Sequence, residues 1–471
     1  MDQNELFFRS KVWELALHIS LSSFIYCFGF SSINPCMDNI GETLGWGGSY
    51  LMISIFAVLY PIGALFGALI GTRISSAYGG RFTIIISNVI FIVGSLISII
   101  PSNYTFGAGR FITGIIGGVF ITIPAVLINE ITPDDMTGQV GTLIQSACNL
   151  GFLVAFLFGL IVPLENLDTS PSNYLWMLII FCPAFFSFYQ IIYFLKVFKT
   201  EFPSWLIKHN REDEARASLR YVYSESGVDI GMKRLMPVSE ENPSTNSSNE
   251  ALILIATPSY KNIFCSKSYR KILRITIALN MGQQTSGSTP LLLYSNSIFK
   301  SMGGGEFIAR VFTVILGLIL LIFGLLAIPL LKKFGRKTIL VLGQALITID
   351  LLLLGFFTGI IDGGVAVNAT LMFLYFAFFM PSLGATCWAY MGEVLNEKCI
   401  SFGLAINLST VVTVSFLFPI LNNFLGMSSC LFIFCGLSFM LFVWEALDLF
   451  ETKGLTKREI LKKALSNNKV V

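Results

Sequence analysis

The chain has 471 residues, of which 54% are hydrophobic and 13% are charged, and its formal net charge is +3. A soluble globular protein carries roughly 25% charged residues, so this composition excludes a soluble enzyme and indicates a protein with many membrane-spanning segments. The small positive charge comes from loops rich in Lys and Arg and does not indicate a nucleic-acid partner.

Apolar runs of about 20 residues, the length needed to span a bilayer, recur along the chain. We expect each of the twelve runs to form a transmembrane helix. The first is followed by many others and lacks a small-residue cleavage site, so we interpret it as helix 1 and not as a signal peptide. The runs lie at 13–33, 50–74, 82–100, 106–129, 139–163, 174–198, 273–299, 309–331, 338–360, 368–392, 402–425 and 428–449.

One long hydrophilic stretch divides the runs into six and six, which favours two similar halves. The predicted fold class is an all-α membrane protein of twelve transmembrane helices, with a helical insertion between the halves. The expected domains are an N-terminal half at 1–199, the insertion at 200–272, a C-terminal half at 273–450 and a tail at 451–471.

The positions of Lys and Arg predict the orientation, because cytoplasmic loops carry an excess of positive charge. Of 31 such residues, only Arg110, Lys300 and Arg310 fall on the side opposite the termini. Both termini and the insertion are therefore expected in the cytoplasm, and the expected location is the plasma membrane.

The N-terminal half has few polar groups at membrane depth. Helix 5 carries Gln145 and Asn149 on one face, and Gln145 is a candidate ligand for a polar solute. An interhelical hydrogen bond explains such an amide equally well. Arg110 lies within a span, where a charge is costly unless it has a partner.

The most informative stretch is residues 282–299, GQQTSGSTPLLLYSNSIF. It begins with adjacent amides and four hydroxyl residues, and Gly282, Gly287 and Pro290 are expected to interrupt the helix. Irregular polar backbone at membrane depth is tolerated where it is buried in protein or lines a cavity. We therefore expect a polar solute to bind at Gln283 and Gln284.

The two halves repeat a pattern of basic loops and carboxylates at the inner membrane edge. Basic residues follow helices 2 and 8, and a glutamate ends helices 4 and 10. This pattern fits an ion-pair lock on the cytoplasmic face. The residues expected in it are Arg81, Glu130, Arg336, Lys337, Glu393 and Lys398.

We expect no catalytic site, no cofactor and no metal. The nine Cys are scattered without metal-ligand spacing, and there are only two His. The segment from Gly335 to Thr338 resembles the end of a nucleotide-binding P-loop, but the preceding GxxxxG is missing. A nucleotide is therefore not expected as a partner.

Motifs along nearly the whole chain resemble, in their order and spacing, those of the sugar porters of the major facilitator superfamily. The resemblance is carried by Gly109-Arg110, Glu130-Ile131-Thr132-Pro133, Gly138, Gln145, Pro203, Trp205-Leu206, Gln283-Gln284-Thr285-Ser286-Gly287, Tyr294, Ile298-Phe299, Gly335-Arg336-Lys337, Trp388, Glu393 and Glu451-Thr452-Lys453-Gly454-Leu455-Thr456.

The resemblance implies the major facilitator fold and a sugar bound in a central cavity. It implies sugar contacts from Gln145, Gln283, Gln284, Thr289 and Trp388. The chemistry agrees, because amides both donate to and accept from hydroxyls and an indole stacks on the apolar face of a ring.

The chain also departs from the pattern of this family. The family has Asn where Thr289 and Leu320 stand, Tyr where Leu293 stands, and an Asn-Trp pair in helix 11 that aligns with Val411-Val412. These differences predict a less polar cavity on its C-terminal side.

Helix 1 bears on energy coupling. By this resemblance, the proton-driven relatives have an acidic residue at the position that Ser31 occupies here. A serine hydroxyl does not titrate. We therefore expect a monomeric facilitative uniporter for a monosaccharide, most simply a hexose, in the lipid bilayer. Two alternatives stay open, namely a proton symporter that uses Asp350 or Glu130, and a non-transporting sugar sensor of transporter ancestry.

Overall fold

The computed structural model of the chain describes residues 6–46, 48–136, 140–163, 174–236, 264, 269–361, 363–395, 397–455, 459–460 and 463–464. The middle of the expected insertion, Gly138 and parts of the expected tail lie outside these residues. Within these residues the regular structure is helical, apart from an isolated antiparallel bridge between Phe7 and Tyr223. The predicted all-α membrane fold is confirmed.

Within the described residues, eleven helical segments are long and apolar enough to cross a membrane. The predicted run at 273–299 is not among them, because its helix is broken into shorter pieces. The twelve predicted spans are therefore eleven continuous segments and one interrupted segment.

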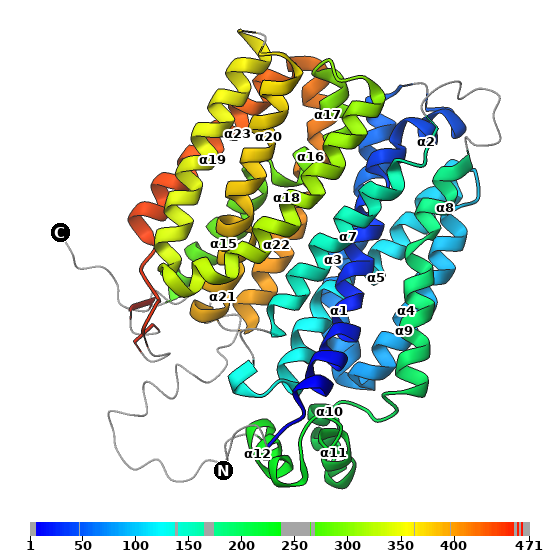
Figure 1. Cartoon of the computed structure of the whole chain (residues 1–471), viewed down its shortest axis with the longest axis vertical. Coiled ribbons are helices and arrows are strands. Elements are labelled where there is room, and N and C mark those ends of the chain that lie inside the picture. The colour runs from blue at the N-terminus through cyan, green and yellow to red at the C-terminus, as the bar shows by residue number, and fades with distance from the viewer. Residues whose placement is uncertain are drawn as a thin grey trace. The chain divides into compact units, whose positions relative to one another are not determined.

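The helices form two compact units, Met1–Glu241 and Asn242–Val471, which are shown from blue to green and from green to red in Figure 1. The first unit contains α1 (Arg9–Ser31), η2 (Asn34–Cys36), α2 (Met37–Thr43), α3 (Tyr50–Tyr78), α4 (Gly80–Ser98), α5 (Asn103–Ile131), η3 (Asp134–Met136), α7 (Thr142–Gly159), α8 (Leu175–Phe181), α9 (Pro183–Lys196), α10 (Pro203–Lys208), α11 (Glu212–Leu219) and α12 (Glu225–Leu235).

The second unit begins with the interrupted helix. It contains α15 (Arg270–Thr285), α16 (Ser288–Leu293), α17 (Ser295–Ser301), α18 (Glu306–Lys333), α19 (Arg336–Gly359), α20 (Gly364–Phe379), the π-helical η6 (Met380–Thr386), α21 (Cys387–Val394), α22 (Glu397–Leu425) and α23 (Met427–Asp448).

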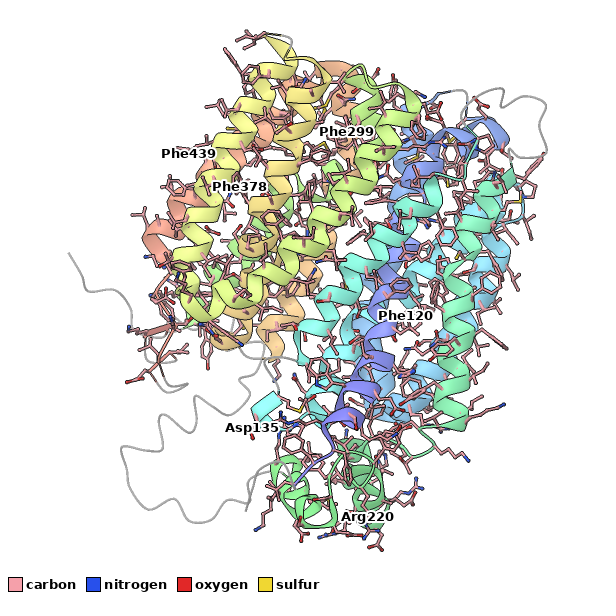
Figure 2. All side chains as sticks on the ribbon, viewed as in Figure 1. Phe120, Asp135, Arg220, Phe299, Phe378 and Phe439 are labelled. Carbon is pink, nitrogen blue, oxygen red and sulfur yellow. The ribbon has the colours of Figure 1, made fainter. Side chains whose placement is uncertain are left out.

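Glycines bring α3 and α5 into direct backbone contact. A Cβ placed on Gly67 would lie 1.7 Å from the carbonyl oxygen of Ile115, and one on Gly63 would lie 2.4 Å from that of Phe111. Small residues at four-residue spacing allow this approach in membrane helices. Large side chains fill the space elsewhere, and Figure 2 shows Phe120 among the helices of the first unit while Phe439 projects outward from α23.

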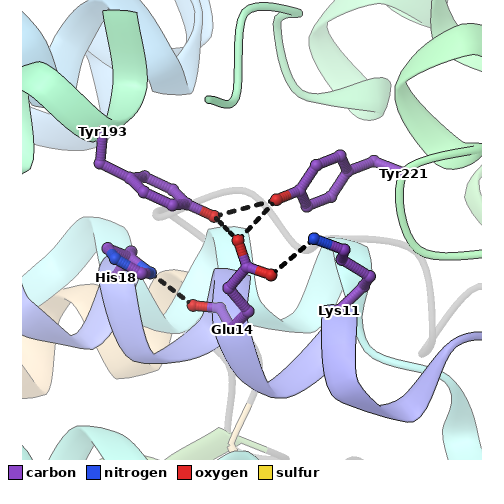
Figure 3. A network of polar contacts seen from close by, with 5 residues as sticks. All are labelled: Lys11, Glu14, His18, Tyr193 and Tyr221. Carbon is purple, nitrogen blue, oxygen red and sulfur yellow. Dashed lines mark hydrogen bonds and ion pairs between the residues drawn. The ribbon is translucent and has the colours of Figure 1, made fainter. Parts of the chain in front are cut away.

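The inserted helices α10–α12 pack onto the end of the first unit where the chain enters α1. Tyr221 donates to the carboxylate of Glu14 across 2.9 Å, and Lys11 pairs with the other oxygen of that carboxylate at 2.8 Å (Figure 3). Arg234 of α12 donates to the carbonyl oxygens of Asn129 and Thr132 at the end of α5. The insertion and the N-terminal helices therefore share one packed region.

Candidate functional site

The helix that carries the polar stretch breaks at Gly287. α15 ends at Thr285, Gly287 has a φ of +93°, and α16 begins at Ser288. A Cβ on Gly287 would lie 2.7 Å from the ring of Phe434. Both the left-handed backbone and this close contact favour glycine, which confirms the predicted interruption. Gly282 and Pro290 do not break the helix, because they lie within α15 and in the first turn of α16.

Three amides form a cluster at the end of α15. Asn407 of α22 donates to Oε1 of Gln283 across 2.7 Å, and Nε2 of Gln284 donates to Oδ1 of Asn407 across 3.1 Å. Their exposed fractions are 5% for Gln283, 8% for Gln284 and 4% for Asn407. Buried amides need such partners in a low-dielectric interior, and the mutual bonds hold all three side chains in fixed orientations.

The start of α16 completes this cluster. The hydroxyls of Ser288 and Thr289 both donate to Oε1 of Gln284, so the break in the helix is the reason that these groups meet. Thr289 is half-buried. The amide cluster therefore joins two segments of an interrupted helix to α22.

Gln283 also connects the break to η6. Its Nε2 donates to the carbonyl oxygen of Leu383 across 2.7 Å, inside the π-helical segment that leads into α21 and Trp388. A π-helical segment leaves free some backbone carbonyls that would accept hydrogen bonds within an α-helix. Such segments occur often at functional sites. Trp388 is half-buried on the first turn of α21.

Asn407 was not predicted from the sequence as part of the site. The resemblance placed the helix 11 amide position at Val411-Val412, but the amide that binds both glutamines lies four residues earlier on α22. An Asn within an apolar run was the available signal. That signal was weak, because a single amide in a membrane helix is explained equally well by helix packing.

The polar residues of the first unit form their own contacts. Gln145 of α7 is half-buried and donates to Oδ1 of Asn149 across 3.1 Å, one turn along the same helix. Its side chain is thus oriented by a neighbour on its own helix.

Arg110 of α5 is 2% exposed and has no carboxylate in contact among the described residues. Its Nη1 donates to the carbonyl oxygen of Gly29 across 2.6 Å, and its guanidinium lies 4.6 Å from the centre of the Tyr60 ring. Gly29 is in the last turn of α1, where the helix dipole favours a cation. Ser31 donates to the carbonyl oxygen of Cys27 in its own helix.

The second unit contains an ion pair at the start of α19. Arg336 and Glu393 are 2.9 Å apart, and the backbone N–H of Arg336 donates to Glu451 across 2.8 Å. Lys337 instead donates to the carbonyl oxygen of Ala446 at the end of α23. Lys398 is half-buried near the start of α22.

The equivalent residues of the first unit have different partners. Glu130 accepts from the backbone N–H of Ser204 across 3.3 Å, whereas the side chain of Arg81 donates to the carbonyl oxygens of Phe194 and Phe198. Arg81 and Glu130 are therefore not brought together as an ion pair. The carboxylate at the start of α4 is that of Glu201, which accepts from the backbone N–H of Arg81 across 2.6 Å.

Glu201 and Glu451 occupy corresponding places in the two units, each against the first N–H groups of a helix. Burial raises the pKa of the Glu201 carboxyl, although backbone N–H donors oppose this shift. Partial burial acts in the same direction on Glu451, but its backbone N–H donors outweigh burial and hold its pKa below the usual value. Neither carboxylate was predicted from the sequence as part of a site.

The profile of the family described as "Sugar (and other) transporter" matches residues 12–463. The chain belongs to this family. It is a sugar transporter of the major facilitator superfamily and an integral, multi-pass membrane protein, and it is not an enzyme, as the sequence predicted.

Its relatives differ in what they carry. The chain is 27% identical to the major myo-inositol transporter IolT of Bacillus subtilis over 84% of this chain and 82% of the relative. It is also 27% identical to the facilitated glucose transporter member 2 of Sus scrofa, over 87% and 76%. The structure of the proton:xylose symporter XylE bound to 6-bromo-6-deoxy-D-glucose has the same fold, with a TM-score of 0.78, 20% identity and coverage of 96% and 98%.

Proposed function

We propose that the protein is a facilitative uniporter for a monosaccharide, with a hexose as the preferred substrate. The single observation that supports this proposal best is the amide cluster of Gln283, Gln284 and Asn407 at the break after α15. These side chains offer both donors and acceptors to ring hydroxyls, and the cluster contains no charge that would require an ionic substrate.

In this proposal the sugar contacts Gln283, Gln284, Thr289 and Trp388, and the family resemblance adds Gln145 as a further contact. Asn407 is added to the predicted set because it bonds to both glutamines. On binding, hydrogen bonds from the sugar hydroxyls would replace some of the hydrogen bonds that the amides make to one another. Release remains easy for the same reason, since the amides regain their own partners when the sugar leaves.

Transport would proceed by alternating access, as in other secondary transporters. The ion pair of Arg336 and Glu393 would belong to a cytoplasmic network that closes the inward path, together with Arg81, Glu130, Lys337 and Lys398. The excess of Lys and Arg on this side supports cytoplasmic termini. A monomer in the plasma membrane is the simplest assembly for this function.

The surroundings of Arg110 support uniport over proton coupling. Its guanidinium binds a backbone carbonyl and faces an aromatic ring, and Ser31 offers a hydroxyl where a proton-driven relative would need an acid. A second candidate function, proton-coupled sugar symport, is favoured by one observation. Asp350 is buried at mid-length in α19, and its Oδ2 has no hydrogen-bond partner among the described residues.

Uptake into liposomes tests the proposal. Purified protein is reconstituted, and the uptake of labelled glucose, labelled xylose and labelled myo-inositol is followed separately, with and without an imposed pH gradient. Saturable uptake that only reaches equilibrium and ignores the gradient is the expected result. Accumulation above equilibrium under an inward proton gradient would establish symport in its place, and the absence of saturable uptake for all three solutes would overturn the proposed substrate class.

The double variant Gln283→Ala with Gln284→Ala connects uptake to the site. Each lost buried hydrogen bond is expected to weaken sugar transport by about 1–3 kcal/mol. Asn423→Ala, at an exposed amide of α22, is the matched control and should transport normally. Unchanged uptake in the double variant would remove the amide cluster from the sugar site.

A further inference from the structure

Two adjoining hollows lie in the first unit where α3, α5 and α10 meet. The inner hollow has a volume of about 150 Å³ and the outer one of about 360 Å³. Thr72, Ser76 and Lys208 line both of them, so the two form one continuous groove, which we call the α3–α10 groove. All of its lining residues belong to the first unit, whereas the amide cluster of the proposed sugar site belongs to the second.

The outer part of the groove is cationic. Arg73 of α3 and Lys208 of α10 are both exposed, and neither makes a hydrogen bond or ion pair within the described part of the chain. The hydroxyl residues Thr72 and Ser76 lie one turn apart on α3 and line the same hollow. Guanidinium and ammonium groups bind phosphate oxygens by charge-assisted hydrogen bonds, and hydroxyls add further donors. The outer part therefore has the chemistry of a phosphate site.

The inner part of the groove has the opposite charge. Glu130 of α5 lines it, and the only donor to its carboxylate in the part of the chain that the structure describes is Ser204, whose backbone N–H lies 3.3 Å from Oε2. Ser75 adds a half-buried hydroxyl. Trp205 and the buried Leu127 form an apolar wall, because the indole N–H is already bound to a backbone carbonyl of α3. A carboxylate accepts from hydroxyls and an indole packs on the apolar face of a ring, so this part suits a polyhydroxylated ring.

The order of these groups along the groove fits one class of ligand. We propose that the α3–α10 groove binds the phosphate ester of a polyhydroxylated ring, with the phosphate between Arg73 and Lys208 and the ring hydroxyls at Glu130. The carboxylate repels a second phosphate at the inner end, so a ring with one phosphate fits better than a bisphosphate. Two sources share this chemistry, namely a soluble sugar phosphate and the headgroup of phosphatidylinositol.

The consequence for transport rests on the proposed function. α10 belongs to the insertion that is expected in the cytoplasm, and Glu130 belongs to the proposed cytoplasmic network. A ligand that occupies Glu130 would hold this carboxylate in one arrangement and slow the transport cycle. A soluble ligand of this class is supplied by phosphoryl transfer to a hydroxyl of the sugar after its entry, so the phosphorylated product would inhibit further uptake.

Binding to the purified full-length protein tests the site without any transport. Calorimetric titration in detergent uses glucose 6-phosphate, inorganic phosphate and glucose 1,6-bisphosphate as probes. Glucose 6-phosphate should bind about tenfold more tightly than either of the others, because it alone makes favourable hydrogen bonds at both ends of the groove. The double variant Gln283→Ala with Gln284→Ala should bind it as the wild type does, since the amide cluster is a separate site.

Single variants locate the ligand. Arg73→Ala and Lys208→Ala remove exposed side chains of the outer part, and each should weaken the binding of glucose 6-phosphate about tenfold by the loss of one charge-assisted hydrogen bond. Lys199→Ala is the matched control, because this exposed lysine lies between α9 and α10 and lines neither hollow. Glu130→Gln should bind glucose 6-phosphate more weakly and glucose 1,6-bisphosphate more tightly, because the repulsion at the inner end is removed.

Nanodiscs with and without phosphatidylinositol distinguish the two sources. Binding of the lipid without binding of glucose 6-phosphate, lost in Lys208→Ala, would assign the groove to the lipid headgroup and support the proposed chemistry. Equal affinity for inorganic phosphate and glucose 6-phosphate overturns the proposal. Binding that survives in both Arg73→Ala and Lys208→Ala also overturns it, as does the absence of binding from both sources.

Uptake separates the inference from the proposed function. In liposomes, glucose 6-phosphate on both sides of the membrane should slow the uptake of labelled glucose by the wild type but not by Lys208→Ala. Equal inhibition of the two proteins would place the inhibitor at another site and overturn the regulatory role. If no sugar is taken up at all, the proposed function fails, and the binding measurements alone decide the inference.

Discussion

The side-chain amide of Asn407 donates to Oε1 of Gln283 across 2.7 Å and thereby joins α22 to the last turn of α15. The same residue accepts from Gln284, so one asparagine orients both glutamines of the proposed sugar site. Its position explains how two neighbouring amides, which would otherwise rotate freely, can be presented to a ligand in a fixed arrangement.

Replacement of Asn407 by Ala should therefore reduce sugar transport nearly as much as replacement of either glutamine. The variant leaves buried amide groups without partners, at a cost of about 1–3 kcal/mol, and the expected result is a higher KM in uptake assays. In a double-mutant cycle with Gln284→Ala, the two effects should be strongly non-additive because the residues are in contact. Simple additivity would show that Asn407 acts independently of the glutamines.

Gly287→Ala should disrupt the helix break. The new Cβ must accept a positive φ and lies 2.7 Å from the ring of Phe434, so we expect a loss of stability above about 1 kcal/mol together with reduced sugar binding. Thermal unfolding in detergent measures the first effect. Gly436→Ala on α23 is the matched control, because a Cβ there meets nothing within 4 Å, and it should unfold at the wild-type temperature.

The pair of Arg336 and Glu393 should affect transport rate more than sugar affinity. Both side chains are partly exposed, so the pair itself contributes only about 0.5–1 kcal/mol, but it joins the start of α19 to the end of α21. Glu393→Gln is expected to change the maximum uptake rate while KM stays close to the wild-type value. The exchange variant Arg336→Glu with Glu393→Arg should recover part of the rate, and a lower rate than either single variant would contradict a role for the pair.

Much of the fold could be predicted because membrane burial imposes a simple pattern. Apolar runs of sufficient length give the spans, and the polar segment around Gly287 gives the interruption, since a broken helix is tolerated at membrane depth only where its backbone finds other partners. Glycines at four-residue spacing, such as Gly63 and Gly67, are a further signal of this kind, because small residues let membrane helices approach closely, as α3 and α5 do.

Partners across the fold could not be predicted in the same way. The sequence suggested that Glu130 pairs with a basic loop, but its partner is the backbone N–H of Ser204, and a backbone donor has no sequence signature. The same reason hides Glu201 and Glu451, which bind the first N–H groups of helices. Asn407 was missed because its contacts with Gln283 and Gln284 depend on the rotation of α22, which an evenly apolar helix does not reveal.

The contributions of the corresponding carboxylates Glu201 and Glu451 to the stability of the fold should change with pH in opposite directions. Backbone donors hold the pKa of Glu451 below its usual value, so its ionised form stabilises the fold above the pKa of the unfolded chain, and this stability is lost as the pH falls through the lower folded pKa. Burial raises the pKa of Glu201. Its ionised form therefore carries a penalty at neutral pH, which is relieved as the pH falls through the raised folded pKa.

Isosteric variants separate these two effects. Glu451→Gln should lower the unfolding temperature at neutral pH. The corresponding loss in the free energy of unfolding is about 0.5–1 kcal/mol for a partly exposed group, and this loss should shrink in acid. Glu201→Gln should cost less at neutral pH and become relatively more destabilising in acid, because the wild type then gains from protonation. Thermal unfolding of both variants and the wild type in the same detergent, over a pH series from neutral to acid, measures the two slopes, and slopes of the same sign would contradict the opposite environments of these carboxylates.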